Sequence, residues 1–290
     1  MIKFQTIESV QDALFERKYV AQRDLATSIF LSLKLHKPLF LEGEAGVGKT
    51  EVGKVLASIL DTQLIRLQCY EGLDVNNAVY EWDYPRQILY LRMLESDRVS
   101  MGDMEDAIFS RKFLLSRPLL EAIENQDGNG PVLLIDEIDR ADEEFESYLL
   151  ELLSDYQITI PEIGTIKAQN PPVVVITSNR TREVHDALKR RCLYQWIDYP
   201  SFEIEFQILR MKVPGLDQQL SHQIVSTVQQ LRESDLFKAP GIAETLDWGR
   251  AIQSMDIKIL DEGTINSTLG VVLKYQDDIL QVKEMFATNH

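Results

Sequence analysis

A glycine-rich segment that ends in a lysine and a hydroxyl carries the clearest chemical signal in this sequence. Its glycines permit backbone conformations in which N–H groups curl round phosphate oxygens. Lys49 would then reach the β- and γ-phosphates of a nucleotide, and the hydroxyl of Thr50 would bind Mg²⁺. A helix N-terminus that follows the loop would favour the same anion through its unpaired N–H groups and its dipole. The segment predicts a phosphate-binding loop made of Gly43, Glu44, Ala45, Gly46, Val47, Gly48, Lys49 and Thr50.

An acidic pair stands far downstream of this loop. Asp136 and Glu137 directly follow the apolar residues 132–135. Such a run is typical of a strand buried on both faces of a parallel sheet, and ligands of open α/β sheets bind at the carboxyl ends of the strands. We expect Asp136 to help hold Mg²⁺ and Glu137 to position the attacking water in nucleotide hydrolysis. Taken alone the pair could equally be an acidic surface turn, but the loop favours the first interpretation.

A second polar group follows another apolar run. Residues 172–177 are rich in valine and isoleucine and lead into Ser178 and Asn179. At the end of a strand the amide of Asn179 would lie where it can orient water or the γ-phosphate. An asparagine in a turn that simply ends a strand is the alternative.

The elements that must position these groups can be read from the apolar spacing. Residues 38–41 form a short apolar run before the loop, and residues 49–60 carry apolar side chains on one helical face. A further strand is expected near 64–67. From Ser201 onward the patterns are helical only, and Pro200 disfavours helix at the residue before it. We therefore expect an α/β nucleotide-binding domain over residues 1–200 and a helical domain over residues 201–290.

The order of these motifs resembles that of AAA+ ATPases, and specifically the MoxR-like branch. The resemblance rests on the loop, on residues 136–141, on Asn179 and on residues 187–192, and it covers the chain from about Val20 to the last helix. Asp139 stands where this branch often has asparagine. The resemblance implies a P-loop AAA+ core, with a parallel sheet flanked by helices, and a smaller C-terminal α-helical lid. It also implies an enzyme that hydrolyses ATP to ADP and phosphate with Mg²⁺.

The resemblance further implies individual roles. The loop corresponds to Walker A, Asp136 and Glu137 to Walker B, and Asn179 to sensor 1. Arg191 is the first choice and Arg190 the second for an arginine finger, which stabilises charge on the phosphoryl group held by a neighbouring subunit. A basic helix end that suits the helix dipole is the alternative for these arginines.

The sensor 2 position is the least defined of these assignments. Ala243 and Glu244 stand at the start of the expected lid helix, where AAA+ proteins often carry arginine. Arg250 follows about two turns later, and seven residues bring a helix nearly back to the same face. Arg250 is therefore either a nucleotide-binding residue or an ordinary surface arginine.

Two segments resemble the client-contacting elements of the MoxR branch. Residues 73–85 match the helix-2 insert, and Tyr80 and Trp82 within it are either client contacts or packing residues. Residues 157–166 alternate apolar and polar side chains around a short turn, which predicts a hairpin. The family implies a chaperone-like ring, commonly a hexamer, that remodels a protein client with a von Willebrand factor A domain partner. The run from Arg190 to Pro200 resembles the branch associated with carbon monoxide dehydrogenase maturation.

Composition bears on the alternatives. The formal net charge is −16, from 46 acidic and 30 basic residues, and such a field repels a phosphate backbone. This disfavours a clamp-loader or helicase-loader relative that handles nucleic acid. A non-hydrolysing nucleotide-binding scaffold is a further alternative, and the intact Lys49, Asp136, Glu137 and Asn179 argue against it.

Targeting signals and structural metal sites are not expected. The residues from Met1 to Gln5 lack the pattern of a signal peptide, and no apolar run approaches the roughly 20 residues that span a bilayer. We therefore expect a cytoplasmic protein. Cys69 and Cys192 are expected to be incidental thiols, and the four histidines lack ligand spacing.

Overall fold

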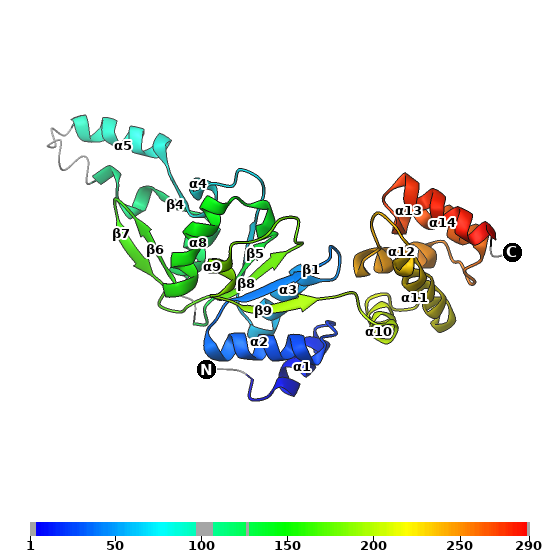
Figure 1. Cartoon of the computed structure of the whole chain (residues 1–290). Coiled ribbons are helices and arrows are strands. Elements are labelled where there is room, and N and C mark those ends of the chain that lie inside the picture. The colour runs from blue at the N-terminus through cyan, green and yellow to red at the C-terminus, as the bar shows by residue number, and fades with distance from the viewer. Residues whose placement is uncertain (1–3, 97–106, 126–127, 289–290) are drawn as a thin grey trace.

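The computed structural model describes residues 4–96, 107–125 and 128–288 of the chain. An α/β part comes first, and a helical part follows it at the opposite end of an elongated molecule (Figure 1). A helical arm, α5 (Tyr84–Ser96), projects from the α/β part on the side away from the helical part. The first three residues of the amino-terminal segment considered above lie outside the described residues.

The α/β part is built on a five-stranded sheet with the order β2-β5-β8-β1-β9. These strands are β1 (Leu39–Gly43), β2 (Leu64–Gln68), β5 (Val132–Asp136), β8 (Val173–Ser178) and β9 (Leu193–Ile197). All four pairings are parallel, so the carboxyl ends of the strands share one edge. The expected strands are confirmed, and β9 is a strand that the sequence reading did not identify.

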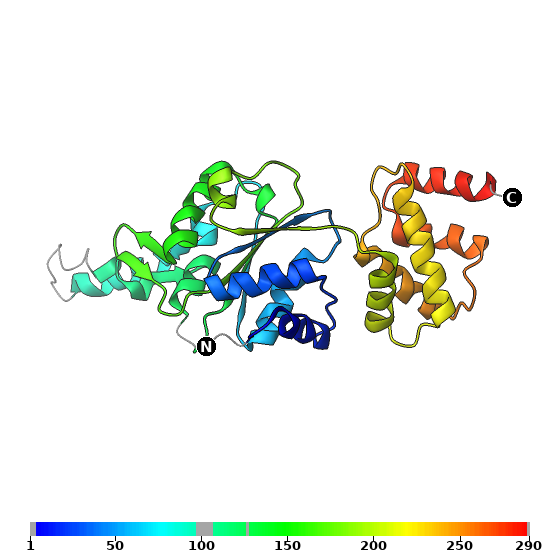
Figure 2. The same cartoon turned by 60° about the horizontal axis from the view of Figure 1, so that its bottom comes forward.

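Helices cover both faces of this sheet (Figure 2). One face packs α1 (Ile7–Glu16), α2 (Arg23–Leu35) and α3 (Lys49–Leu60), and the other packs α7 (Pro118–Glu124), α8 (Glu143–Asp155) and α9 (Asp186–Lys189). Alternation along β1 explains the two cores, because Leu39 and Leu41 join the first and Phe40 joins the second. A doubly covered parallel sheet of this kind confirms the expected fold class.

Two small antiparallel sheets extend the α/β part. Strands β6 (Gln157–Ile160) and β7 (Gly164–Lys167) form the expected hairpin. Strand β3 (Tyr80–Trp82) pairs with β4 (Leu114–Ser116), and α4 (Val75–Ala78) precedes it. Trp82 is buried and packs edge-on against Phe109 with the ring centroids 5.4 Å apart, so it is a packing residue and not a client contact. Pro85, the last residue of the segment matched to the helix-2 insert, lies in the first turn of α5, where proline is tolerated.

The C-terminal part consists of five helices: α10 (Phe202–Lys212), α11 (Gln218–Glu233), α12 (Ile242–Ser254), α13 (Glu262–Val272) and α14 (Gln276–Thr288). Their core centres on Trp248, whose indole N–H donates to the hydroxyl of Thr268 at 2.8 Å. Beside this core Arg232 and the fully buried Glu205 form an ion pair of 2.6 Å. Across the described parts of the chain, no helix combines the length and apolar character that a membrane crossing needs.

Candidate nucleotide-binding site

The predicted phosphate-binding loop connects β1 to α3 at the carboxyl edge of the sheet. Gly46 and Gly48 have φ values of +80° and +97°, which residues with a side chain rarely adopt. Gly43 is required for a different reason, because a Cβ at this position would lie 2.0 Å from the carbonyl oxygen of Ile197 on β9. The strand–loop–helix context that the sequence motif needs is therefore present.

Lys49 begins α3 and is held inside the loop. Its Nζ donates to the carbonyl oxygens of Gly43 at 2.7 Å and Glu44 at 2.6 Å. Burial lowers the pKa of Lys49 to about 8, although Asp139, Glu44 and other nearby carboxylates act in the opposite direction. The ammonium group lies in a cradle of oxygens that phosphate oxygens could replace.

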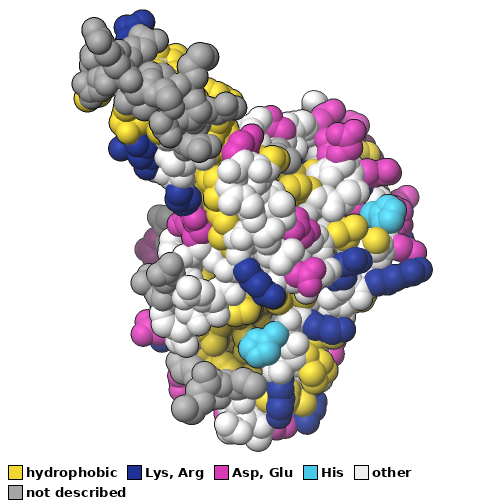
Figure 3. Space-filling model, turned by 90° about the vertical axis from the view of Figure 1, so that its left-hand side faces the viewer, with side chains coloured by type: hydrophobic (Ala, Val, Ile, Leu, Met, Phe, Trp, Pro, Cys, Tyr) yellow, Lys and Arg dark blue, Asp and Glu magenta, His cyan; other side chains and the backbone are white. Residues whose placement is uncertain are grey.

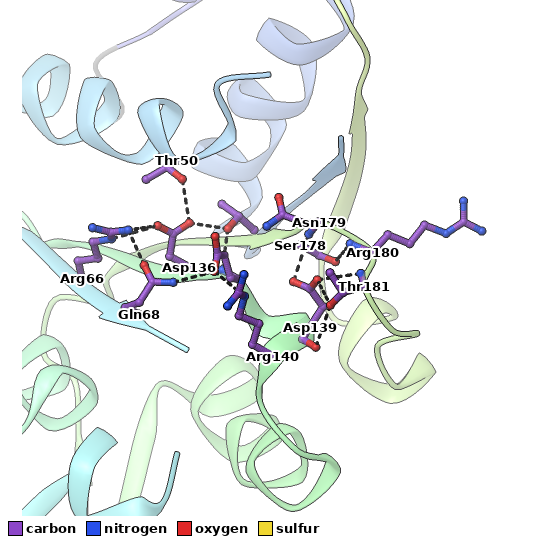
Figure 4. Close-up of polar contacts among 12 residues, drawn as sticks. Thr50, Arg66, Gln68, Asp136, Asp139, Arg140, Ser178, Asn179, Arg180 and Thr181 are labelled. Carbon is purple, nitrogen blue, oxygen red and sulfur yellow. Dashed lines mark hydrogen bonds and ion pairs between the residues drawn. The ribbon is translucent and has the colours of Figure 1, made fainter. Parts of the chain in front are cut away.

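Thr50 and Asp136 meet as the sequence predicted. The Thr50 hydroxyl donates to Oδ1 of Asp136 at 2.9 Å, and the Thr177 hydroxyl on β8 donates to the same oxygen at 2.6 Å (Figure 4). A hydroxyl and a buried carboxylate at hydrogen-bond distance are hard oxygen donors of the kind that Mg²⁺ prefers alongside phosphate oxygens. The residues present therefore fit a magnesium ion.

Arg66 is a member of the site that sequence reasoning missed. From β2 it donates to Oδ2 of Asp136 through Nε at 3.0 Å and Nη2 at 2.5 Å. Arg66 is brought to the site by the register of the strands, in which Gln68 pairs with Asp136 and Arg66 lies two residues before Gln68 on the same face. Register is a tertiary property, so the motif search could not reveal this residue.

Glu137 follows β5 with a left-handed backbone, at φ +58°. Its amide donates to the Thr177 hydroxyl at 2.9 Å. Its carboxylate accepts from Gln68 at 3.1 Å and forms an ion pair with Arg140 at 2.8 Å. Glu137 therefore lines the cavity with a carboxylate whose direction two polar neighbours set.

The contacts of Asp139 explain why a carboxylate is accommodated at a position where the MoxR-like branch often has asparagine. It lies in the short helix η2 (Ile138–Arg140), and its two oxygens accept from the amide of Asn179 at 3.1 Å and from the amide and hydroxyl of Thr181 at 2.9 and 2.7 Å. Burial alone raises the pKa of Asp139, but these hydrogen bonds outweigh it and lower the pKa below the usual value. Asp139 thus fixes the turn that carries Asn179.

Most of the predicted site residues line one cavity of about 600 Å³, whereas Arg66 and Asp139 lie outside its lining. The predicted residues that line it are Ala45, Gly46, Val47, Gly48, Lys49, Thr50, Asp136, Glu137, Asn179 and Arg250. The far side is largely apolar and comes from four distant segments, with Tyr19, Val20, Ile197, Ile204, Ile208, Ile242 and Leu246 among its residues. Sequence reasoning did not identify this side, because apolar residues in a binding pocket look like any other core residues.

The helical part contacts the loop directly. The amides at the start of α12, those of Ile242 and Ala243, donate to the carbonyl oxygen of Gly46 at 3.0 and 3.4 Å. Lys212 at the end of α10 pairs with Glu51 on α3 at 2.9 Å. Arg250 lines the cavity from α12 and pairs with Asp247 at 3.0 Å. The helical part therefore closes one side of the cavity.

The two candidate finger arginines lie outside the lining of this cavity. Arg191 donates to the Ser154 hydroxyl at 2.6 Å and to the Ala187 carbonyl oxygen at 2.8 Å. Arg190 has a side chain that is 80% exposed and pairs with Asp186 at 3.6 Å. Of the two, Arg190 is the less constrained within its own chain.

Known proteins resemble this chain in sequence and in fold. An uncharacterized protein of Staphylococcus aureus (strain bovine RF122 / ET3-1) is 25% identical over 205 residues, which are 68% of this chain and 69% of that protein. One from Staphylococcus haemolyticus is 24% identical over the same shares. Two variants of RuvB from Thermotoga maritima share the fold with a TM-score of 0.51 and 17% identity, covering 87% and 95% of this chain and 70% and 73% of theirs.

The family comparison covers the phosphate-binding loop, Asp136, Glu137 and Asn179, whereas most of the apolar side of the cavity lies outside it. The sequence profile of the AAA domain (dynein-related subfamily) matches residues 38–192, which run from the start of β1 through Asn179 to the finger candidates. This match extends over more than half of the chain. The protein therefore belongs to the AAA domain family of the dynein-related subfamily.

Proposed function

We propose that this protein is an ATP-hydrolysing, MoxR-like AAA+ chaperone that works as a ring and remodels a protein client. One observation carries the hydrolytic part of the proposal. Lys49 follows the loop after β1, and Asp136 and Asn179 stand at the ends of β5 and β8, yet all three line a single cavity whose remaining lining is apolar enough for a nucleobase.

Each polar group has a definite task in this proposal. Lys49 exchanges its contacts with the carbonyl oxygens of the loop for contacts with the β- and γ-phosphates. Thr50 and Asp136 hold Mg²⁺, which neutralises the charge that develops on the phosphates. Glu137 positions the attacking water, and the amide of Asn179 orients the γ-phosphate. Arg250, which lines the cavity from α12, contacts phosphate from that side.

The position of the arginines supports assembly. Neither Arg190 nor Arg191 lines the cavity of its own chain, so either can act on transferred phosphate only in another subunit. A closed ring supplies every cavity with such an arginine. We infer a hexamer from the resemblance to the MoxR branch, and a von Willebrand factor A domain protein as the partner on the same basis.

The surface of α5 supports a protein client. Figure 3 looks onto the end of the molecule that bears this arm, where hydrophobic and basic side chains lie close together. The exposed apolar side chains on α5 are Tyr84, Ile88, Leu89 and Met93. Exposed apolar clusters of this kind commonly mark sites of protein interaction. The maturation of a metalloenzyme is the client process that the sequence resemblance suggests.

The test is a hydrolysis assay with a size measurement in parallel. Purified protein and Glu137→Gln are assayed for ATP turnover and examined by size-exclusion light scattering with ATP, and duplex and single-stranded DNA are added to separate samples. Glu144→Gln, an exposed acid on α8, is the matched control. We expect the wild type and the control to hydrolyse ATP and Glu137→Gln to lose this turnover. Light scattering should show a ring with ATP, and neither form of DNA should change the rate of turnover. Strong stimulation by DNA would favour a nucleic-acid motor instead.

A further inference from the structure

Glu42 is a buried acid that the proposed chemistry leaves without a role. It lies on β1 directly before the loop, and it is 4% exposed. Its Oε2 accepts a hydrogen bond from the Tyr194 hydroxyl at 2.8 Å. Its Oε1 is buried and has no hydrogen-bond partner among the described residues. Burying such an oxygen costs free energy unless a nearby positive charge compensates it, so the charges around Oε1 matter.

The charge nearest to this oxygen belongs to Lys189. The Lys189 ammonium lies 3.6 Å from Oε1, which is an ion pair but too long for a hydrogen bond. The same ammonium lies 3.6 Å from Glu183, whose side chain is 77% exposed. At equal distance the buried carboxylate interacts more strongly, because solvent screens the exposed one. Glu42 is therefore the dominant partner of Lys189.

Lys189 is the last residue of α9, and the two candidate finger arginines follow it directly. The short helix is anchored at two further points, by the fully buried Leu188 and by the bond of Arg191 to Ser154. The pair with Glu42 joins this segment through side chains to the strand leading into the phosphate-binding loop, and β9, which begins directly after the segment, pairs with the same strand. A shift of β1 at Gly43 would therefore change the position of Arg190.

We propose that Glu42 is a positioning residue which couples the nucleotide loop of one subunit to the arginines that the same subunit presents to its neighbour. The inference rests on the proposed trans-acting arginine and deepens it. Binding of nucleotide at the loop changes the position of Glu42, which moves Lys189 and with it the arginine segment. Each cavity in a ring thereby reports its state to the next one through the ion pair of the buried Glu42 with Lys189.

The test uses mixed rings in which donor and acceptor roles are separated. Subunits with Glu137→Gln keep their arginines but cannot hydrolyse, and subunits with Arg190→Ala and Arg191→Ala together keep an intact cavity but donate no arginine. Neither population hydrolyses ATP alone. After mixing under conditions that exchange subunits, turnover returns at interfaces where the first population donates to the second. This rescue must be seen first, and its absence would refute the trans-acting arginine and the coupling together.

Glu42→Gln is then placed in one population at a time. In the donor we expect the rescued rate to fall about 5-fold or more, the scale of a typical coupling between sites. In the acceptor we expect the rescued rate to stay within about 2-fold of the parental mixture, because the arginine-presenting segment of that subunit is unused. Equal losses in both positions, or a loss in the acceptor alone, would overturn the proposal and make Glu42 a support for its own loop.

Two further variants separate positioning from damage to the fold. Lys189→Gln removes the other half of the pair and should reproduce the donor-specific loss. Glu183→Gln removes the equidistant but exposed carboxylate and should leave the rescued rate unchanged in either population. All variants should bind a fluorescent ATP analogue with wild-type affinity. A donor-specific loss with Glu183→Gln but not with Lys189→Gln would contradict the assignment.

Discussion

Arg66 donates two hydrogen bonds to a single oxygen of Asp136, Oδ2, while the other oxygen faces Thr50. The guanidinium thus holds one edge of the carboxylate and leaves the opposite edge directed at the hydroxyl that would share a magnesium ion. Asp136 is 1% exposed, so this arginine is also its main compensating charge.

Arg66→Met should destabilise the protein without nucleotide more than the protein with it. Loss of the guanidinium leaves a buried carboxylate short of its partner, which costs about 1–3 kcal/mol of unfolding free energy. The low end applies because Arg66 itself is half-exposed. Mg²⁺ with ATP restores positive charge beside Asp136. The rise in melting temperature on adding both should therefore be larger in the variant than in the wild type, and an equal rise would contradict the assigned geometry.

Gly241→Ala should weaken nucleotide binding through the lid. A Cβ at Gly241 would lie 2.9 Å from backbone atoms of Gly46, and backbone cannot yield cheaply. The start of α12 would move away from the loop and open the cavity. We expect a higher Kd for ATP by titration, with little change in the melting temperature of the core. Gly270→Ala is the control, because its Cβ meets nothing within 4 Å and should raise helix stability by about 0.5–1 kcal/mol.

Asp139→Asn should lower stability at neutral pH and lose this effect in acid. The carboxylate accepts from three donors, and an amide would turn one NH₂ group toward them, at a cost of about 1–2 kcal/mol. The pKa of Asp139 is lowered in the folded state, so its contribution is complete above the unfolded value of about 4 and is lost as pH falls through the lower folded value. Urea unfolding of both proteins at pH 7 and near pH 3 checks this. A constant difference would contradict it.

Both thiols should be inert in the folded protein. Burial raises the pKa of Cys69 to about 12 and that of Cys192 to about 12, so almost no thiolate is present at pH 8. We expect slow alkylation by iodoacetamide in the native state and rapid alkylation in guanidinium. Because both folded values are raised, their stability contribution is full below the unfolded pKa and declines as pH rises toward 12. Rapid native labelling at pH 8 would show that the thiols are accessible.

The sequence by itself determined the parts of this protein whose physics is local. The loop from Gly43 to Thr50 needs its glycines for backbone reasons alone, and the helical face of residues 49–60 and the hairpin of residues 157–166 show their own periodicity. Apolar runs likewise indicated the strands that end at Asp136 and Ser178. Because parallel strands end at one edge, the convergence of Lys49, Asp136 and Asn179 followed from these local patterns and the fold class.

Only the tertiary structure decided which side chains contact the residues of the site. Arg66 reaches Asp136 through the register of β2 and β5, and Glu42 on β1 reaches Lys189 at the end of α9, so both pairs join segments that lie far apart in the chain. The sequence did not reveal the apolar side of the cavity for a related reason. Tyr19 and Ile242 lie far apart in the chain, and only the folded structure brings them to one cavity. Trp82 is a further example, because it packs against Phe109, which lies far from it in the sequence. Long-range packing, which local periodicity does not carry, sets the partners of each functional group.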